Sequence, residues 1–471
     1  MATTSNPLSA PFTRRDIFRI AGVGALAATL GSACASEESN APVSTGTAPE
    51  EKFTEPTTKL SGDLKILLWK HFVPSHDDWF DGFAAAWGAK VGVNVIIDHI
   101  DQKEIPARIA AEIQANSGHD LIEYIAPLAS YEPSVIDMKD VTDEATKRFG
   151  PQLELCRKSS LNPFTNKFYA YSPGWVPDPG NYRKSLWEPV GFPNGPSTWD
   201  ELLSGATEIK KSRNIPLGLG MSQEVDSNMV LRSLMWSFGA SEQNAEGKIS
   251  INSPETVAAL DYMKKLYENT MTPEVFGWDA ASNNQGLVAG QLSYIVNSIS
   301  AWRTAQEKNP EIADDVYFTK ALQGPKAALA AQHVLYNWIV PKFSTKADAA
   351  KEFLLHCTEN YAAATYASKL YDLTGYPSRV PDQNTWLSDD PFGAKPADKL
   401  KVLVDAEPWS VNIGYPGGAS AATGEVFGTF VIPNMFAKVA KGELSAKDAI
   451  ADAEQQMVRI YDKWRANGLI S

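Results

Sequence analysis

The sequence predicts an α/β protein with two lobes, and three observations support this prediction. Residues 64–125 alternate strand-like and helix-like segments in the order βαβαβ, which produces a parallel sheet covered by helices. Residues 169–197 contain six prolines, so no long regular element can cross them and the chain changes direction there. Thr198 and Glu201 then form a capping-box pattern, which starts the first helix of a second lobe at Trp199.

Residues 1–34 have the pattern of an export signal. Arg14-Arg15 precedes a weakly hydrophobic run, as in a twin-arginine signal peptide, and the run is too short to remain as a membrane helix. The stretch that ends at Cys34 resembles a lipobox, so we expect a lipoprotein anchored to the membrane through Cys34 and located outside the cytoplasm. Cleavage after Ala35, which would release the protein, stays open as an alternative.

Residues 35–63 are rich in Ser, Thr, Pro and Glu and contain few apolar residues. Such a segment cannot bury enough surface to fold. We therefore expect a disordered tether between the anchor and the first lobe.

The composition and the motifs exclude several classes of function. The net charge of −13 argues against a nucleic-acid partner, which would need a basic surface. No nucleophile elbow, metalloprotease motif or phosphate loop is present, so no catalytic residue and no cofactor are expected. Of the six histidines, only His71 and His76, beside Asp77, are close enough to suggest a metal, and we expect none. Cys156 and Cys357 either pair or remain separate buried thiols.

The first lobe begins with a continuous apolar run, Leu64 to Trp69, which is typical of a strand buried on both faces. Further strands are expected at 93–97 and 121–125. Ligands of open parallel sheets lie beyond the carboxyl ends of the strands. The residues just past the first and third strands are therefore candidates by position: Lys70, His71, Phe72, Ala126 and Pro127.

Later segments extend both lobes. Residues 199–274 are mainly helical in pattern, and Lys447 to Ala466 form an amphipathic helix with Trp464 on its apolar face. Strands near 316–320 and 334–340 are expected to join the sheet of the first lobe.

Trp175 is the strongest single candidate for contact with a ligand. Prolines at 173 and 177 disfavour a helix or a central strand there, and a large ring on a loop needs a covering partner. Trp278 and Asp279 occupy a similar loop position, whereas Trp199, in the first turn of a capped helix, is expected to be structural.

Three stretches in the middle of the chain resemble one known family. The aromatic run from Tyr169, the Pro-Val-Gly at 189–191 and the Pro-Ser-Thr-Trp-Asp-Glu-Leu-Leu at 196–203 are similar to the extracellular solute-binding proteins of ABC transporters. The closest resemblance is to their carbohydrate-binding family, which includes maltose-binding protein. Residues 290–297 resemble the segment with which that family leaves its second lobe.

The resemblance implies a periplasmic-binding-protein-like fold, in which two α/β lobes with discontinuous domains are joined by a hinge that the chain crosses several times. The implied first lobe comprises 64–172 and 298–372, and the second, helix-rich lobe comprises 173–297 and 373–471. Such lobes close over a ligand.

The resemblance also implies a cleft that collects residues from each crossing. The C–H faces of sugars stack on aromatic rings, and sugar hydroxyls need amide, carboxylate or guanidinium partners. The candidate ligand-binding residues are Trp175, Lys70, His71, Asp178, Trp278, Asp279, Asn297, Trp302, Asn337, Trp338, Tyr376, Arg379 and Trp409.

The function that the resemblance implies is capture of a carbohydrate or polyol by a monomer, which delivers it to the permease subunits of an ABC importer. Two alternatives stay open. A sugar phosphate would need basic partners, for which Lys70 and Arg379 are the candidates. A secreted carbohydrate-active enzyme would need two carboxylates that are close only in space.

Overall fold

The structure is a computed structural model, and it describes residues 47–471. The predicted export signal, the lipidation of Cys34 and the first part of the predicted tether lie outside the described residues. Within 47–471, no helix is both long enough and apolar enough to span a bilayer.

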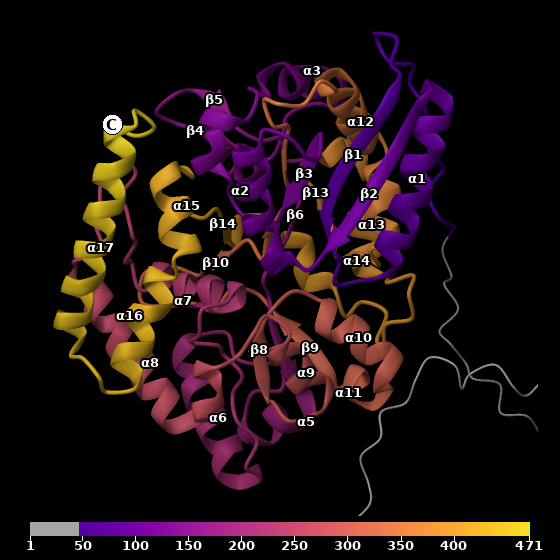
Figure 1. Ribbon diagram of the computed structural model, residues 1–471. Helices are drawn as coiled ribbons and strands as arrows, with labels where there is room; N and C mark the ends of the chain where they lie inside the picture. The colour runs from indigo at the N-terminus through magenta and orange to yellow at the C-terminus, as the bar shows by residue number, and fades with distance from the viewer. Residues whose placement is uncertain (1–46) are drawn as a thin grey trace, which may run out of the picture. The chain divides into compact units, whose positions relative to one another are not determined.

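A four-stranded sheet forms the centre of the first lobe (Figure 1). Its order is β12-β3-β1-β2, with β1 (Gly62–Trp69), β2 (Val93–Ile100) and β3 (Leu121–Tyr124) parallel and β12 (Asn337–Ile339) antiparallel to β3. Residues 66–69 of β1 are at most 3% exposed, as expected for a strand buried on both faces. The predicted parallel pairing of these three strands is confirmed.

Two helices connect the parallel strands, α1 (Ser75–Val91) and α2 (Ile105–Ala115). Phe80 and Trp87 recur at helical spacing on α1, and both rings contact the ring of Phe353. These contacts bury one face of α1 in the first core.

Three short strands from distant parts of the chain form a second sheet, which we call the crossing sheet. Its central strand β6 (Gly174–Val176) pairs antiparallel with β11 (Val334–Leu335) and with β13 (Leu373–Thr374). Trp175 lies in the middle of β6 and is 2% exposed. The prediction of a loop at Trp175 is therefore wrong. A strand of three residues fits between Pro173 and Pro177, and these prolines, which have no N–H to donate, lie outside the strand.

A third sheet has the order β8-β7-β9. Its central strand β7 (Gly180–Arg183) is antiparallel to β8 (Tyr294–Val296) and to β9 (Val316–Thr319). The prediction that β9 joins the sheet of the first lobe is wrong, since an apolar run specifies that a strand is buried but not which strand it pairs with.

The longest helices of the second buried core pack around it, and α16 contacts both α8 and α17 (Figure 1). They are α6 (Trp199–Arg213), α7 (Val225–Ser237), α8 (Pro254–Thr270), α16 (Val431–Ala440) and α17 (Ala446–Ala466).

The start of α6 is at Trp199, as predicted. The Thr198 hydroxyl accepts a hydrogen bond from the backbone N–H of Glu201 at 3.0 Å. The Glu201 carboxylate reaches one residue further back than predicted and accepts from the N–H and the hydroxyl of Ser197, both at 2.7 Å. The cap therefore still satisfies exposed donors at the helix start.

The remaining α-helices and strands are short or lie at the edges of the lobes. The helices are α3 (Lys139–Phe149), α4 (Glu154–Lys158), α5 (Lys184–Trp187), α9 (Ser282–Val288), α10 (Ser300–Lys308), α11 (Pro310–Asp315), α12 (Ala347–Glu359), α13 (Tyr361–Ala367), α14 (Gln383–Ser388) and α15 (Ala421–Gly428). The strands are β4 (Leu161–Asn162), β5 (Lys167–Phe168), β10 (Ala330–Ala331) and β14 (Ser410–Val411).

Leu373, Leu400 and Trp409, in the segment 373–471 that was predicted for the second lobe, pack in the first buried core. The predicted lobe boundaries stay a prediction. Cys156 and Cys357 are separate free thiols. Burial raises the pKa of the Cys156 thiol to about 12.

Residues 47–61, at the end of the predicted tether, lie against the first lobe. The backbone N–H of Lys52 donates to Asn360 Oδ1 at 2.6 Å, and the Thr57 hydroxyl donates to Glu352 at 2.6 Å. The indole N–H of Trp79 on α1 donates to Glu51 at 2.9 Å. This part of the predicted tether is therefore held by α1, α12 and the start of α13.

One buried ion pair joins α10 to the loop after α14. The Arg303 guanidinium donates to both carboxylate oxygens of Asp390, at 3.1 and 2.6 Å, and both side chains are at most 2% exposed. We expect Arg303→Gln to lower the free energy of unfolding by about 3–5 kcal/mol, because it leaves the Asp390 charge buried without its partner. Urea denaturation measures this loss.

The matched control is Arg465→Gln, which breaks an exposed pair with Asp462 on α17. Its loss should be at most about 1 kcal/mol, since solvent screens exposed ion pairs. Equal losses in the two variants would contradict the role assigned to the buried pair.

Candidate functional site

A cavity of about 850 Å³ lies between the strand ends of the first lobe and helices of the second core. One wall is formed by Phe72 after β1 and by residues 126–128 after β3. The opposite wall is formed by the start of α7, the loop 278–281 and the junction of α15 with α16. The volume is in the range of small-molecule sites.

The first-lobe wall follows from the sheet topology. β1 and β3 are parallel neighbours, so their carboxyl ends open at the same edge of the sheet. The structure places Phe72, Ala126 and Pro127, three of the candidates chosen by position, on this wall. Lys70 is exposed and His71 lines a different, smaller cavity.

The lining combines aromatic rings with hydrogen-bonding side chains. Rings can stack on flat apolar faces of a ligand, while carboxylates and amides can bond to its hydroxyls. The aromatic residues are Phe72, Tyr124, Tyr131, Trp278, Phe427, Phe430 and Trp464. The polar residues with long or charged side chains are Asp101, Gln102, Lys103, Gln223, Glu224, Asp279, Glu425 and Lys463.

Residues 82–392 match the family described as bacterial extracellular solute-binding protein. The chain belongs to this family. Among curated relatives, a binding protein of Brucella abortus is 29% identical over 92 residues, which are 19% of this chain and 22% of the relative. An ABC transporter-binding protein of Deinococcus radiodurans is 25% identical over 193 residues, which are 39% of this chain and 46% of the relative. The matched regions thus span about a fifth to a half of these relatives.

Solved structures show the same fold at low sequence identity. An oligosaccharide periplasmic-binding protein from Synechococcus, crystallised in complex with zinc, superposes with a TM-score of 0.73 at 17% identity, over 85% of this chain and 100% of that one. A sugar transporter protein from Arthrobacter chlorophenolicus with bound laminaribiose has a TM-score of 0.71 at 16% identity, over 84% and 99% of the two chains. The predicted periplasmic-binding-protein-like fold, with two α/β lobes, is confirmed.

Trp278 and Asp279 are the two predicted ligand-binding residues that line the large cavity of this solute-binding protein. The loop that carries them is fixed by local hydrogen bonds. The Ser222 hydroxyl donates to the backbone carbonyl of Trp278 at 2.6 Å, and the Ser282 hydroxyl donates to Asp279 Oδ1 at 2.7 Å. The bond from Ser282 also lowers the pKa of Asp279, so its carboxylate is ionised near neutral pH.

The other predicted residues lie behind or away from this cavity. Asn297 donates to Asp226 behind the cavity wall. His71 and Trp338 line the smaller cavity of the first lobe. The Trp302 indole donates to Ala313 inside the first core. The remaining predicted residues also do not line the large cavity: Lys70, Trp175, Asp178, Asn337, Tyr376, Arg379 and Trp409.

Several lining residues were not predicted. Tyr124 is the last residue of β3, so the strand-end rule could have found it. Trp464 was assigned to the apolar face of the last helix, but its half-buried ring lines the cavity and its N–H donates to Glu425 Oε2 at 2.5 Å. The Lys463 ammonium binds the same oxygen at 2.7 Å, which fixes all three side chains at the cavity edge.

Two buried carboxylates stand at the base of the second-lobe wall. Glu224 caps α7 by accepting from the backbone N–H groups of Asp226 and Ser227. Asp226 accepts from Asn283 Nδ2 at 2.7 Å and from Asn297 Nδ2 at 3.3 Å. Burial, followed by the nearby Asp226 charge, raises the pKa of Glu224 above its ordinary value, and burial also raises the pKa of Asp226.

A smaller cavity in the first lobe brings together potential metal ligands. His71, His76 and Asp372 each offer one atom there, and these atoms lie within 4.8 Å of one another. No residue set of this kind is associated with the large cavity among the described residues.

We expect Phe430→Gly to be more stable than Phe430→Ala by about 1 kcal/mol. Phe430 has φ of 56° and ψ of 34°, a left-handed conformation that only glycine adopts without strain. Both variants remove the ring from the cavity wall, so the comparison isolates the backbone term. Thermal unfolding of the two variants measures it, and an alanine variant at least as stable as the glycine variant would contradict it.

The raised pKa of Glu224 predicts a specific loss of stability with pH. The native state binds the proton of the Glu224 carboxyl more tightly than the unfolded chain does. The stabilisation from this proton is therefore complete below the ordinary pKa of 4.5 and is lost as pH rises through the native pKa. When the pH rises from about 5 to about 8, the free energy of unfolding should therefore fall less in Glu224→Gln than in the wild type. The difference between the two falls should be at least about 1 kcal/mol.

Urea unfolding at several pH values measures this difference. The matched control is Glu246→Gln, which changes an exposed carboxyl and should keep the wild-type dependence. An unchanged dependence in Glu224→Gln would refute the assignment.

Proposed function

We propose that this chain is the substrate-binding component of an ABC importer and that it captures a carbohydrate or polyol in the large cavity. The observation that carries the proposal is the lining itself, in which seven aromatic rings from both sides alternate with carboxylate and amide groups. This combination fits the apolar faces and the hydroxyls of a sugar. The laminaribiose bound to the Arthrobacter protein supports the same ligand class.

The charges of the lining favour a neutral ligand over a sugar phosphate. Asp101, Asp279 and Glu425 bring carboxylates to the cavity, and each of its two lysines lies beside one of them: Lys103 Nζ is 3.7 Å from Asp101 and Lys463 Nζ is 2.7 Å from Glu425. A phosphate would need a cluster of free cations. The two basic residues considered for that role, Lys70 and Arg379, do not line the cavity.

Closure would take place at the crossing sheet. Its three strands are two or three residues long, and its central strand β6 ends four residues before β7 of the third sheet. Small changes in the backbone angles at such points can rotate one lobe relative to the other. A ligand that contacts both walls would stabilise the closed form.

We further propose that the protein is exported by a twin-arginine signal, anchored as a monomer through lipidated Cys34, and delivers its ligand to membrane permease subunits. The family consists of extracellular solute-binding proteins, which supports a location outside the cytoplasm. The Deinococcus relative is an ABC transporter-binding protein, which supports delivery to a permease.

The test is binding of neutral sugars, polyols and sugar phosphates to the purified protein, screened by thermal shift and quantified by calorimetry. A ligand that binds only the native state raises the unfolding midpoint. We expect a neutral sugar or polyol to do so. We expect Trp278→Ala to weaken its binding at least about tenfold, because the variant loses the contact area of one ring.

The matched control is Trp386→Ala. Trp386 is half-buried like Trp278, but it packs against Tyr366 and does not line the cavity. The Trp386→Ala variant should bind the neutral sugar or polyol with the affinity of the wild type. Stabilisation by glucose 6-phosphate and by no neutral sugar would refute the ligand class, and hydrolysis of a bound sugar would favour the enzyme alternative.

A further inference from the structure

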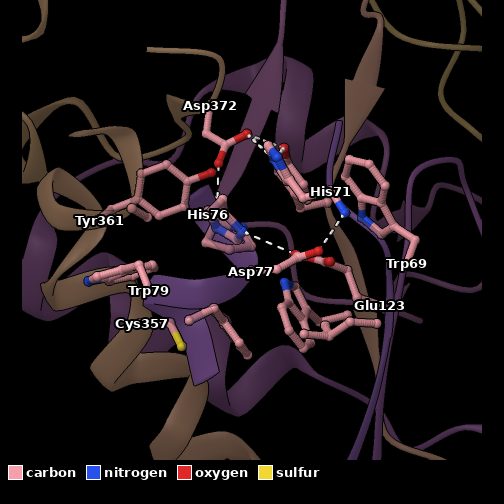
Figure 2. A pocket seen from close by; sticks show the side chains of 15 residues that line it. Trp69, His71, His76, Asp77, Trp79, Glu123, Cys357, Tyr361 and Asp372 are labelled. Carbon is pink, nitrogen blue, oxygen red and sulfur yellow. Dashed lines mark hydrogen bonds and ion pairs between the residues drawn. The ribbon is translucent and has the colours of Figure 1, made fainter. Parts of the chain in front are cut away.

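The small cavity of the first lobe has the features of a metal site that is separate from the solute cavity. It has a volume of about 40 Å³ and lies between the loop after β1, the start of α1 and the residue that precedes β13. A cavity needs about 10–15 Å³ to hold one water, so an ion with one or two waters fits. Figure 2 shows His71, His76 and Asp372 directed toward one another around this space.

The distances among the three side chains fit shared coordination. His71 Nε2 lies 3.2 Å from Asp372 Oδ1, and His76 Nε2 lies 3.6 Å from Asp372 Oδ2. In a tetrahedral site with bonds of about 2.0–2.1 Å, neighbouring ligand atoms are about 3.3–3.4 Å apart. Two imidazoles and one carboxylate are a ligand set that Zn²⁺ accepts.

The half-buried ring of His76 makes no hydrogen bond to a protein group within residues 47–471. Its Nε2 is 3.6 Å from Asp372 and its Nδ1 is 3.9 Å from Asp77, and both distances are too long for a hydrogen bond. Nδ1 is a buried atom without a hydrogen-bond partner. Stacking on His71 and Phe80 holds this ring, but no hydrogen bond within the described part of the chain uses its nitrogen atoms, and an ion between Nε2 and Asp372 would do so.

Surrounding groups could orient the three ligands. Without a metal, His71 Nδ1 accepts a hydrogen bond from the backbone N–H of Val73 at 2.9 Å. The carbonyl oxygen of Val73 lies 3.1 Å from the same nitrogen and would accept its proton once Nε2 binds a metal. The Tyr336 hydroxyl donates to Asp372 Oδ1. Asp77 accepts from the backbone N–H of His71 at 3.0 Å and lies on the Nδ1 side of His76.

The charge around the cavity also suits a cation. Asp77 lines it together with Asp372, and none of its lining residues in the described chain is a lysine or arginine. The side chains of His71 and Asp372 are each 2% exposed, whereas that of His76 is 15% exposed and provides the side from which an ion could enter.

We propose that His71, His76 and Asp372 bind a divalent transition-metal ion of the zinc class. The ion would tie the loop after β1 and the first turn of α1 to Asp372, the residue before strand β13 of the crossing sheet. Phe72, on the wall of the solute cavity, follows His71 directly, so the ion would also fix this wall.

The test uses the purified protein without a polyhistidine tag, stripped with a chelator and then titrated with Zn²⁺. We expect one Zn²⁺ per chain by calorimetry and by elemental analysis after dialysis, and a higher unfolding midpoint with Zn²⁺ than with chelator. Co²⁺ should give the visible absorption of a low-symmetry nitrogen and oxygen site. His76→Ala and Asp372→Asn should each lower the Zn²⁺ affinity at least about tenfold.

The matched control is His99→Asn. The His99 side chain is 18% exposed, and its Nε2 bonds to Asp81 at 2.9 Å instead of facing Asp372. It should bind Zn²⁺ as the wild type does. Because His76 is the most exposed ligand, His76→Ala should fold, which circular dichroism of the metal-free protein checks. Wild type without bound Zn²⁺, or a folded His76→Ala with unchanged affinity, would overturn the proposal.

Discussion

The pairing of three distant chain segments in the crossing sheet is the constraint on which the rest of the structure depends. β6, β11 and β13 are too short to be stable alone, and β6 in the centre pairs with β11 on one side and with β13 on the other. The packing is close: a Cβ on Gly174 would collide with the Tyr361 hydroxyl. This sheet holds three distant segments together in the first core, and β7 of the third sheet begins four residues after its central strand β6 ends.

The large cavity follows from that placement. The first core contributes strand ends, where backbone and side chains converge because the strands are parallel, and the second core contributes helix starts and helix junctions. Loop hydrogen bonds at Trp278 and the ion pair at Glu425 already restrict the motion of the cavity walls. Less conformational entropy is therefore lost when a ligand binds. The two proposed sites differ in kind: one is wide and aromatic, the other small and rich in metal-binding atoms.

Local sequence rules predicted the elements better than the site. The parallel strands, the start of α6 and the wall position of Phe72 follow from periodicity, capping and topology, all of which are encoded over a few residues. Trp175 carried the same local signal as Trp278, yet it is buried in a strand, because only tertiary packing decides which aromatic ring stays accessible. The role of Trp464 could not be predicted from helical spacing, which does not distinguish a core face from a cavity wall. Asp372 is 296 residues from His76, so no sequence spacing could join them.

The contacts of residues 51–57 with α1, α12 and the start of α13 determine how a mechanical load on the N-terminal chain would spread. Tension would reach the first lobe through several hydrogen bonds in parallel before it reached the crossing sheet. The first lobe would thus act as the fixed body and the second as the moving one. In a tethered protein, opening and closing would then swing the helices α6, α8 and α17 through solution while the four-stranded sheet kept its orientation.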